Sequence, residues 1–395
     1  MSARYYWVGL LLLWSSWQVA RAADVTLTVS NEDDRQRQEV VAIDLQAVCQ
    51  RLGIAVGEPF VVRNAFGQEV GYQKTYDGQL LLDVAVQPHG QAVYRVTKGV
   101  PQPPKCYVQG AMYPIRKDDI AWENDRGAYR VYGPALQRTG EKSFGTDVWV
   151  KNTPELVVAH RYRMDYEGNV QEDSLYKIGK KNEARQIDLR TSFHLDQGNG
   201  MDAYSVGPTL GCGAPALMVD GRLVFPYCYE RYQILDNGPL RFTVALDYAP
   251  NADGIKEHRI ITLDKGMHLN RMTVWYDGIQ QPVALVSGVV LHGDAGVVVE
   301  KDRVLYADPT DNPQKHNSQI FVAALFPNGL SQTLVHQQDG HRHALGILND
   351  YRGQRYTYYF GSAWSRYDVP TLAQWQNCVD NELHQLRNPL SIQIQ

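Results

Sequence analysis

The sequence of 395 residues has few cysteines, and it has none of the short motifs that mark the best-known enzyme classes. No C-x-x-C pair occurs, which argues against a structural zinc site. The serine-hydrolase elbow G-x-S-x-G, the zinc-protease motif H-E-x-x-H and the dinucleotide fingerprint G-x-G-x-x-G are all absent. Nucleophilic catalysis through serine or cysteine is therefore not indicated, and no motif for a metal or another cofactor stands out.

Strong charge and long apolar runs are also scarce. The formal net charge is only −4, and no basic stripe argues for a nucleic-acid ligand. One apolar run, Tyr5–Trp17, follows Arg4 and precedes the A-x-A site Ala20–Ala22. This pattern predicts a secretory signal peptide over residues 1–22, and the run is too short for a comfortable membrane span. We expect an exported protein, periplasmic or extracellular in a Gram-negative bacterium, with no membrane span once the signal peptide is removed.

Five cysteines are present, so at least one thiol must stay unpaired. An exported protein reaches an oxidising compartment, which permits a disulfide. The pair to test first is Cys212 with Cys228, although spacing alone does not decide connectivity.

The chain is long enough for two domains, and we expect two of unequal size. Residues 23–100 are predicted to form a small β-rich domain, with a hairpin at Asp77-Gly78 and helical spacing over Ile43–Leu52. Three prolines within residues 101–104 indicate a stiff linker.

Residues 105–395 are rich in strand-length apolar runs that are separated by Gly, Asp, Asn and Pro turns. Among these runs are ELVVAHRYRMDY (155–166) and IDLRTSFHLD (187–196). Helical spacing returns only in residues 371–388. The fold class that follows is mostly β, a large antiparallel sandwich preceded by a small β-sandwich-like domain.

The stretch Asp118–Pro134, DDIAWENDRGAYRVYGP, carries aromatic and charged residues where a β-core would carry Val, Ile and Leu. Side chains alternate along a strand, so Trp122, Asn124 and Arg126 share one face, opposite Glu123. After Gly127 the residues sharing a face are Ala128, Arg130 and Tyr132. Such a face is typical of a polar, aromatic-lined cleft, although a solvated sheet face held by Arg–carboxylate pairs is the open alternative.

A second candidate segment is Gly145–Lys151, in which Asp147, Trp149 and Lys151 share a face opposite Val148 and Val150. These groups suit a sugar hydroxyl, a pyranose face and a carboxylate. An exposed sheet face explains the pattern equally well.

The third segment is His194–Gly213, where five glycines lie among His, Asp and Tyr residues. Glycine allows sharp turns and close backbone approach to a ligand, and His194, Asp202 and Tyr204 are the strongest acid–base candidates of the chain. The alternative is a turn with local side-chain caps. Calcium binding by Asp196, Asn199 and Asp202 is conceivable, but the spacing does not follow the EF-hand pattern.

Scattered histidines and a late aromatic segment complete the candidates. His292 ends an apolar strand, where a polar group can face a cleft. The pair His341 and His343 would project from one strand face and could ligate a metal, but no third ligand is evident. Tyr359 and Trp364 lie around a glycine and suit either stacking on sugar or core packing. The excess of Tyr (24) over Phe (9) also favours a half-wet, ligand-stacking surface.

Several of these motifs resemble a known family. DDIAWENDRGAYRVYGPAL, TDVWVKN, the run from His194 to Gly211, LDNGPLRF and YFGSAW, in this order, are similar to the family named domain of unknown function 4861. The resemblance implies an exported bacterial protein associated with pectin- and uronide-degrading enzymes. It also implies a β-supersandwich like that of galactose mutarotases and several polysaccharide lyases. Asn199 and Ala214 stand where the family pattern has Glu and Gly, which leaves no acid at position 199.

Two classes of function follow. The first is an enzyme on acidic, uronic-acid-containing oligosaccharides. A lyase would use His194 or Tyr204 as base, with Arg126, Arg130 and Asn124 stabilising the developing charge.

A hydrolase would instead need two carboxylates from Glu123, Asp147 and Asp202, and an epimerase would pair His194 or His292 with Glu123. The second class is a non-catalytic carbohydrate-binding protein of a polysaccharide-utilisation system, in which the same groups hold a uronide without chemistry. The sequence leaves the oligomeric state open.

Overall fold

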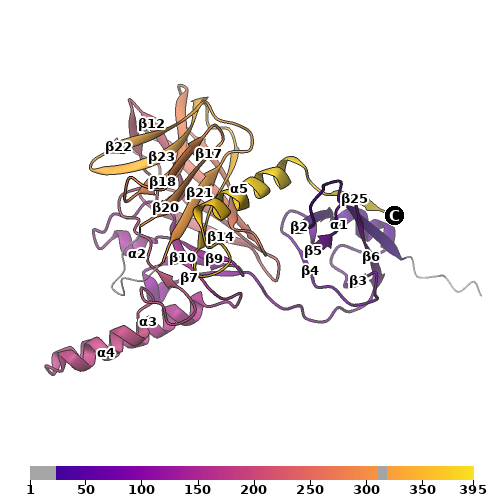
Figure 1. The fold of residues 1–395 in the computed structure, drawn as a ribbon, viewed down its shortest axis with the longest axis horizontal. Helices are drawn as coiled ribbons and strands as arrows, with labels where there is room; N and C mark the ends of the chain where they lie inside the picture. Colours follow the sequence, from indigo (N-terminus) through magenta and orange to yellow (C-terminus); the bar gives the residue numbers. More distant parts are fainter. Residues whose placement is uncertain (1–23, 310–317) are drawn as a thin grey trace, which may run out of the picture.

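The computed structural model describes residues 24–309 and 318–395, arranged as a large β-domain and a small one (Figure 1). The expected signal peptide, residues 1–22, lies outside the described residues. Among the described residues, no helix is long and apolar enough to cross a membrane.

The small domain contains two antiparallel sheets around one apolar core. Its elements are β1 (Val25–Ser30), β2 (Arg37–Asp44), α1 (Leu45–Leu52), β3 (Phe60–Asn64), β4 (Tyr72–Lys74), β5 (Gln79–Val86) and β6 (Gln91–Lys98). Helix α1 confirms the predicted helical spacing; Asp44 caps it by accepting a hydrogen bond from the Ala47 amide at 2.9 Å. The Asp77-Gly78 hairpin joins β4 to β5, as predicted. The last strand of the chain, β25 (Ser391–Ile394), pairs with β1.

The large domain is built from three antiparallel sheets that share one apolar core. The first sheet has the order β11-β10-β9-β8-β7, the second β13-β12-β18-β23-β22, and the third β14-β15-β16-β17-β24-β21-β20-β19. The strands are β7 (Gln109–Tyr113), β8 (Asp119–Glu123), β9 (Gly127–Val131), β10 (Asp147–Val150), β11 (Met201–Asp202), β12 (Cys212–Val219), β13 (Arg222–Val224), β14 (Tyr229–Asn237), β15 (Arg241–Tyr248), β16 (Lys256–Asp264), β17 (Leu269–Asp277), β18 (Val283–Leu291), β19 (Val297–Glu300), β20 (Arg303–Asp308), β21 (Ile320–Leu325), β22 (Gln332–Gln338), β23 (His341–Tyr351) and β24 (Tyr356–Trp364). Two short helices connect strands of the first sheet: η1 (Pro114–Arg116) lies between β7 and β8, and α2 (Pro134–Gln137) lies between β9 and β10. The predicted fold class, mostly β with a large antiparallel sandwich after a small β-domain, is confirmed.

The predicted C-terminal helix is α5 (Leu372–Arg387), which packs on the eight-stranded sheet. Thr371 caps it by accepting a hydrogen bond from the Gln374 amide at 3.2 Å. The buried Trp375 donates from Nε1 to the Val322 carbonyl at 3.2 Å.

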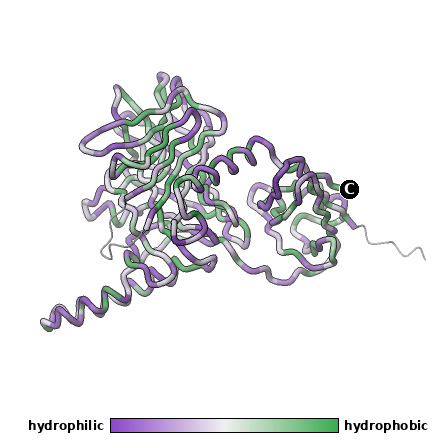
Figure 2. Tube along the Cα trace, in the orientation of Figure 1, coloured by the Kyte–Doolittle hydropathy of each residue, from purple (hydrophilic) through white to green (hydrophobic). Residues whose placement is uncertain are grey.

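The predicted strands at 155–166 and 187–196 are wrong, because this region forms helices α3 (Val158–Lys177) and α4 (Lys181–Thr191). The buried positions at the start of α3 are Val158, Arg161 and Tyr162, a spacing of three and four residues that fits a helix. Helix α4 extends away from the sandwich (Figure 1), and most of its residues are hydrophilic (Figure 2). With so much of both helices in water, no apolar stripe runs along them to reveal the helical period.

Cys212 and Cys228, the pair to test first for a disulfide, are not bonded, and all five cysteines are free. Cys212 is buried at the start of β12, where its thiol contacts the Gly361 carbonyl at 3.4 Å. Burial raises the pKa of this thiol, which therefore serves as a small core residue.

Candidate functional site

A pocket of about 760 Å³ lies between the edge of the first sheet and helix α4. Five residues that the sequence singled out line it: Arg130, Tyr132, His194, Asp202 and Tyr204. The remaining lining residues include Arg116, Glu141, Lys142, Arg185, Asp188 and Ser205–Gly207. We call this the Arg130 pocket.

Three neighbouring strands place the charged residues of the pocket side by side. In the register of β9 and β10, Asp147 lies directly opposite Arg130, and β11 adds Asp202 opposite Trp149. The alternate residues Val148 and Val150 pack in the main core, as the alternation predicted.

Arg130 is 3% exposed and binds three carboxylates. Its Nε donates to Asp147 Oδ2 at 2.8 Å, its Nη2 to Asp202 Oδ2 at 2.7 Å, and its Nη1 contacts Asp119 Oδ2 at 3.5 Å. Burial raises the pKa of Asp119 to about 6 against the opposing charge of Arg130, and burial raises the pKa of Asp147 in the same way. One cation among three buried carboxylates favours retention of a proton. With its donors engaged by these aspartates, Arg130 is an organising residue of the pocket.

His194 is oriented by the backbone beside this cluster. Its Nδ1 lies 3.0 Å from the Asp202 carbonyl oxygen and 3.6 Å from Asp202 Oδ2, while about half of the side chain is exposed. A carbonyl oxygen only accepts, so Nδ1 carries the hydrogen and the neutral ring keeps its lone pair on Nε2. His194 therefore lines the pocket in an orientation that its contacts with Asp202 fix.

Tyr132 supplies a hydroxyl to the same pocket. Its oxygen accepts a hydrogen bond from Arg130 Nη2 at 3.5 Å, and the side chain is half-buried. Burial, with Asp147 close by, raises the pKa of Tyr132 well above its ordinary value. The phenol stays protonated, so it can donate a proton but not act as a base. His194, Asp202, Arg130 and Tyr132 thus form one continuous chain of contacts.

Tyr204 contributes to the wall of the pocket, but its hydroxyl is buried and has no hydrogen-bond partner in residues 24–309 and 318–395. Its ring packs edge-on against His292 at 5.8 Å. His292 in turn bonds through Nδ1 to the buried Asp308 at 2.7 Å. His292 is therefore placed behind Tyr204 and does not line the pocket.

Glu123 lies outside the pocket and holds the start of helix α3. Its carboxylate accepts hydrogen bonds from the amides of Val157 and Val158, each at 2.8 Å, and pairs with Lys151 Nζ at 2.7 Å. An acidic group at a helix N-terminus satisfies amides that have no intrahelical partner. The local role of Glu123 is structural.

The two tryptophans proposed as stacking platforms are buried. Trp122 is fully enclosed, with Tyr129 and Phe242 at ring distances of 6.0 and 6.1 Å. Trp149 is 3% exposed and stacks on Phe193 at 4.9 Å. Neither ring has a free face for a sugar, because both are packed against other aromatic side chains in the interior.

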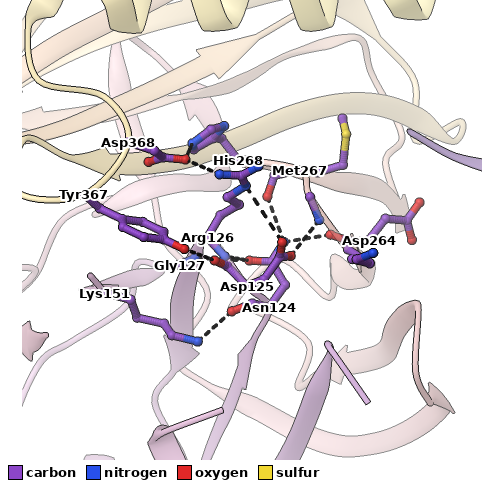
Figure 3. Close-up of polar contacts among 12 residues, drawn as sticks. Asn124, Asp125, Arg126, Gly127, Lys151, Asp264, Met267, His268, Tyr367 and Asp368 are labelled. Carbon is purple, nitrogen blue, oxygen red and sulfur yellow. Dashed lines mark hydrogen bonds and ion pairs between the residues drawn. The ribbon is translucent and has the colours of Figure 1, made fainter. Parts of the chain in front are cut away.

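Asn124 and Arg126 organise the turn between β8 and β9 (Figure 3). Asn124 accepts from the amides of Arg126 and Gly127, and its Nδ2 donates to the carbonyls of Asp264 and Met267 at 2.7 and 2.8 Å. Arg126 pairs with Asp368 at 2.6 Å (Figure 3). Neither residue lines the Arg130 pocket.

Tyr359 and Trp364 lie elsewhere again. Tyr359 is partly buried against the cluster that includes Trp375 of α5. Trp364 is 2% exposed, with the guanidinium of Arg366 5.5 Å from its ring. The late aromatic segment serves packing.

Within the described ranges, no group of three or more His, Cys, Asp or Glu side chains is arranged to hold a metal ion. The oxygens considered for calcium have internal partners: Asp196 accepts from two backbone amides, and Asn199 accepts from Arg161 at 3.0 Å. His343 is buried and accepts from the Leu210 amide at 3.2 Å.

Among the residues that sequence reasoning missed are Arg116, which lines the pocket, and Arg161, which holds one of its loops. Arg116 lies 5.0 Å from the Phe193 ring, and no hydrogen bond or ion pair to Arg116 occurs in the described part of the chain. Arg161 fastens the loop of His194 by donating to the carbonyls of Ser192 and Leu195 at 2.9 and 2.5 Å. A single arginine in a three-residue helix such as η1 gives no sequence signal, and Arg161 was hidden by the wrong strand prediction.

Known proteins match the chain over most of its length. It is 26% identical over 336 residues to "Uncharacterized protein P7" of Formosa agariphila, covering 80% of this chain and 78% of that protein. Among solved structures, an alpha-mannosidase from Enterococcus faecalis V583 matches at 9% identity and a TM-score of 0.41. A protein in glycosyl hydrolase family 38 from Enterococcus faecalis matches at 8% identity and a TM-score of 0.49.

These two matches cover 94% of this chain, which spans about half of each solved chain, 46% and 47% respectively. The family described as Domain of unknown function (DUF4861) matches residues 29–392, nearly the whole sequence. The chain therefore belongs to the DUF4861 family.

Proposed function

We propose that the protein is a carbohydrate-active lyase that cleaves acidic, uronic-acid-containing oligosaccharides of the pectin type in the Arg130 pocket. The observation that carries the proposal is the His194 ring, which is held through Nδ1 by the Asp202 carbonyl and keeps Nε2 free as a base. The signal-peptide pattern of residues 1–22 supports action outside the cytoplasm.

The proposed chemistry is β-elimination. His194 Nε2 takes the proton from C5 of the uronide, beside its carboxylate, and the electron pair of that C–H bond forms the C4–C5 double bond. The C4–O bond breaks, and the leaving glycosyl oxygen takes the proton of Tyr132. Arg116, which has no hydrogen bond or ion pair within residues 24–309 and 318–395, binds the substrate carboxylate and stabilises the negative charge that develops on it.

Hydrolysis is a weaker fit. A hydrolase needs one carboxyl as acid and another as base or nucleophile, both facing the sugar. Asp119, Asp147 and Asp202 are each at most 3% exposed on their side chains and share the single Arg130. Simple binding without chemistry would use Arg116 in the same way but would not require an oriented base.

The deciding experiment incubates the purified protein with oligogalacturonides and follows the absorbance of the unsaturated product. A rise in that absorbance supports a lyase. Reducing-end release without it indicates hydrolysis. Binding without any product, over a range of pH and with or without calcium, leaves the carbohydrate-binding alternative and overturns the enzyme.

Two variants test the named roles. His194→Ala should lower kcat by about 100-fold or more, because general base catalysis contributes 10²–10⁴-fold. Tyr132→Phe should reduce turnover with little change in substrate affinity, because it removes only the proton donor. The matched control is His89→Ala, an exposed histidine of the small domain. Full turnover by a folded His194→Ala protein would remove His194 from the mechanism.

A further inference from the structure

A second hollow of about 320 Å³ lies next to the Arg130 pocket. Lys142 lines both, and the loop that contributes Ser205–Gly207 to the first hollow contributes Pro208 to the second. The second hollow, which we call the phenylalanine slot, is further lined by Phe144, Phe225, Gln338, Asp339, His341 and His343. The two hollows are therefore consecutive along one surface.

Two aromatic rings give the slot its shape. Phe144 and Phe225 stack with ring centroids 5.6 Å apart and an angle of 21° between their planes. Both are half-buried, so part of each ring faces the hollow. A partly exposed aromatic face in a hollow suits the C–H face of a sugar ring.

The buried end of the slot is uncharged. His343 accepts from the Leu210 amide through Nε2, so its hydrogen is on Nδ1. Burial, with His336 and His341 nearby, lowers the pKa of His343 to about 3, which keeps the ring neutral at physiological pH. The buried Nδ1–H has no acceptor in residues 24–309 and 318–395.

Some polar side chains at the rim of the slot have hydrogen-bond or ion-pair partners within the described part of the chain, and others do not. Gln338 exchanges hydrogen bonds of 2.6 and 3.1 Å with the main chain of β13, and Asp339 pairs with Arg222 at 2.9 Å. The side chains of Lys142 and His341 have no hydrogen bond or ion pair in the described ranges, so both are available to a ligand.

We propose that the phenylalanine slot is a second sugar-binding subsite, which holds a further unit of the oligosaccharide cleaved in the Arg130 pocket. The ring of that unit packs on Phe144 and Phe225. Lys142 lines both hollows, and it pairs with the carboxylate of the sugar unit that lies between the Arg130 pocket and the phenylalanine slot. This inference rests on the proposed action on acidic oligosaccharides.

The test compares a short and a long substrate. The wild-type protein should have a higher kcat/KM for hexagalacturonate than for trigalacturonate, because the longer chain reaches both hollows. Phe225→Ala should lower kcat/KM for the hexamer by about tenfold and leave the trimer unchanged. The control is Phe66→Ala, an exposed phenylalanine of the small domain (88% exposed). An equal effect of Phe225→Ala on both substrates, or no length preference in the wild type, overturns the subsite.

Binding of hexagalacturonate, measured by calorimetry, separates failure of this inference from failure of the proposed reaction. Weaker binding by folded Phe225→Ala supports the subsite even in a protein that makes no product. Unchanged binding by that variant overturns the subsite and leaves any lyase activity standing. A wild-type protein that neither binds nor cleaves the hexamer contradicts both proposals.

Discussion

The polar residues of the stretch Asp118–Pro134 fall into two groups with different structural roles. Arg130 and Tyr132 belong to the pocket, whereas Glu123, Asn124 and Arg126 hold neighbouring elements together. Burial of a charge is costly unless it is paired and hydrogen-bonded, so each charged residue here needed partners from elsewhere. A strand rich in polar residues can therefore reflect buried hydrogen bonds and ion pairs of the fold as readily as a functional site.

The Lys151–Glu123 pair offers a test at the residue scale. Lys151 is 1% exposed, and its removal in Lys151→Met leaves the Glu123 carboxylate buried without its cation. Loss of one partner of a buried pair costs about 3–5 kcal/mol, so the free energy of unfolding should fall by that order. Urea unfolding followed by tryptophan fluorescence measures it.

The control for this prediction is Lys105→Met. Lys105 and Glu155 form an exposed pair at 3.0 Å, and solvent screening makes the contribution of such a pair to stability small. A Lys151→Met protein no less stable than Lys105→Met would contradict the structural role given to the buried pair.

At the scale of elements, alternation along strands and helical spacing correctly predicted the elements that bury a single apolar face. Val148 and Val150 face the main core as expected, and α1 and α5 follow the apolar spacing read from the sequence. Helices α3 and α4 were missed because few of their residues are buried. A helix without an apolar stripe has no period to read.

The candidate site was predictable only in part, for a related reason. His194, Asp202, Arg130 and Tyr132 were recognised by residue type, and the structure brings them into one pocket. Which polar residues are free and which are committed depends on partners far along the chain; Arg130 and Asp202 are 72 residues apart. Arg116, which has no ion pair among the described residues, could not be separated from the other arginines of the sequence without that information.

Helix α5 carries a buried acid that should make its docking depend on pH. Burial raises the pKa of Glu382 to about 7, although His268 opposes the shift, and Oε1 accepts from the His268 amide at 3.1 Å. The folded state thus favours the protonated acid. Its stabilising contribution is complete below the ordinary pKa near 4.5 and is lost as the pH rises through about 7.

Glu382→Gln keeps the acceptor oxygen and removes the ionisation. As the pH rises from 5 to 8, the free energy of unfolding of the variant should increase relative to that of the wild type. The increase should be at most about 1.4 kcal/mol for each pH unit that separates the ordinary pKa of Glu382 from its pKa in the folded protein. Urea unfolding at both pH values gives the difference. Glu155→Gln, at an exposed site, should show no such trend; the same trend in both variants would rule out the assigned cause.

At the scale of the molecule, the two domains are joined at more places than the proline linker. The chain leaves the small domain through residues 99–108 and returns to it after α5, where β25 pairs with β1. Side chains also cross the junction: Lys265 pairs with Asp83, and Tyr76 donates its amide to Asp236 at 2.9 Å. The small domain is therefore joined to the large one by two crossings of the chain and by side-chain contacts.

Gln73 makes three hydrogen bonds across this junction. It is 7% exposed, accepts from the amides of Leu240 and Arg241 at 2.9 and 2.8 Å, and donates to the Arg241 carbonyl at 3.0 Å. Gln73→Leu leaves three backbone groups without a partner, at a cost of about 1–3 kcal/mol for each group that stays buried. Opening of the junction to water is the cheaper response, so the domains should separate more often while each keeps its own core. Proteolysis within residues 99–105 should accelerate by about tenfold, since cleavage follows the population of the open form.

The control is Gln91→Leu, which removes a surface hydrogen bond to Ser30 and should leave the cleavage rate unchanged. Equal rates in Gln73→Leu and the wild type would mean that β25 and the other contacts hold the domains together without Gln73.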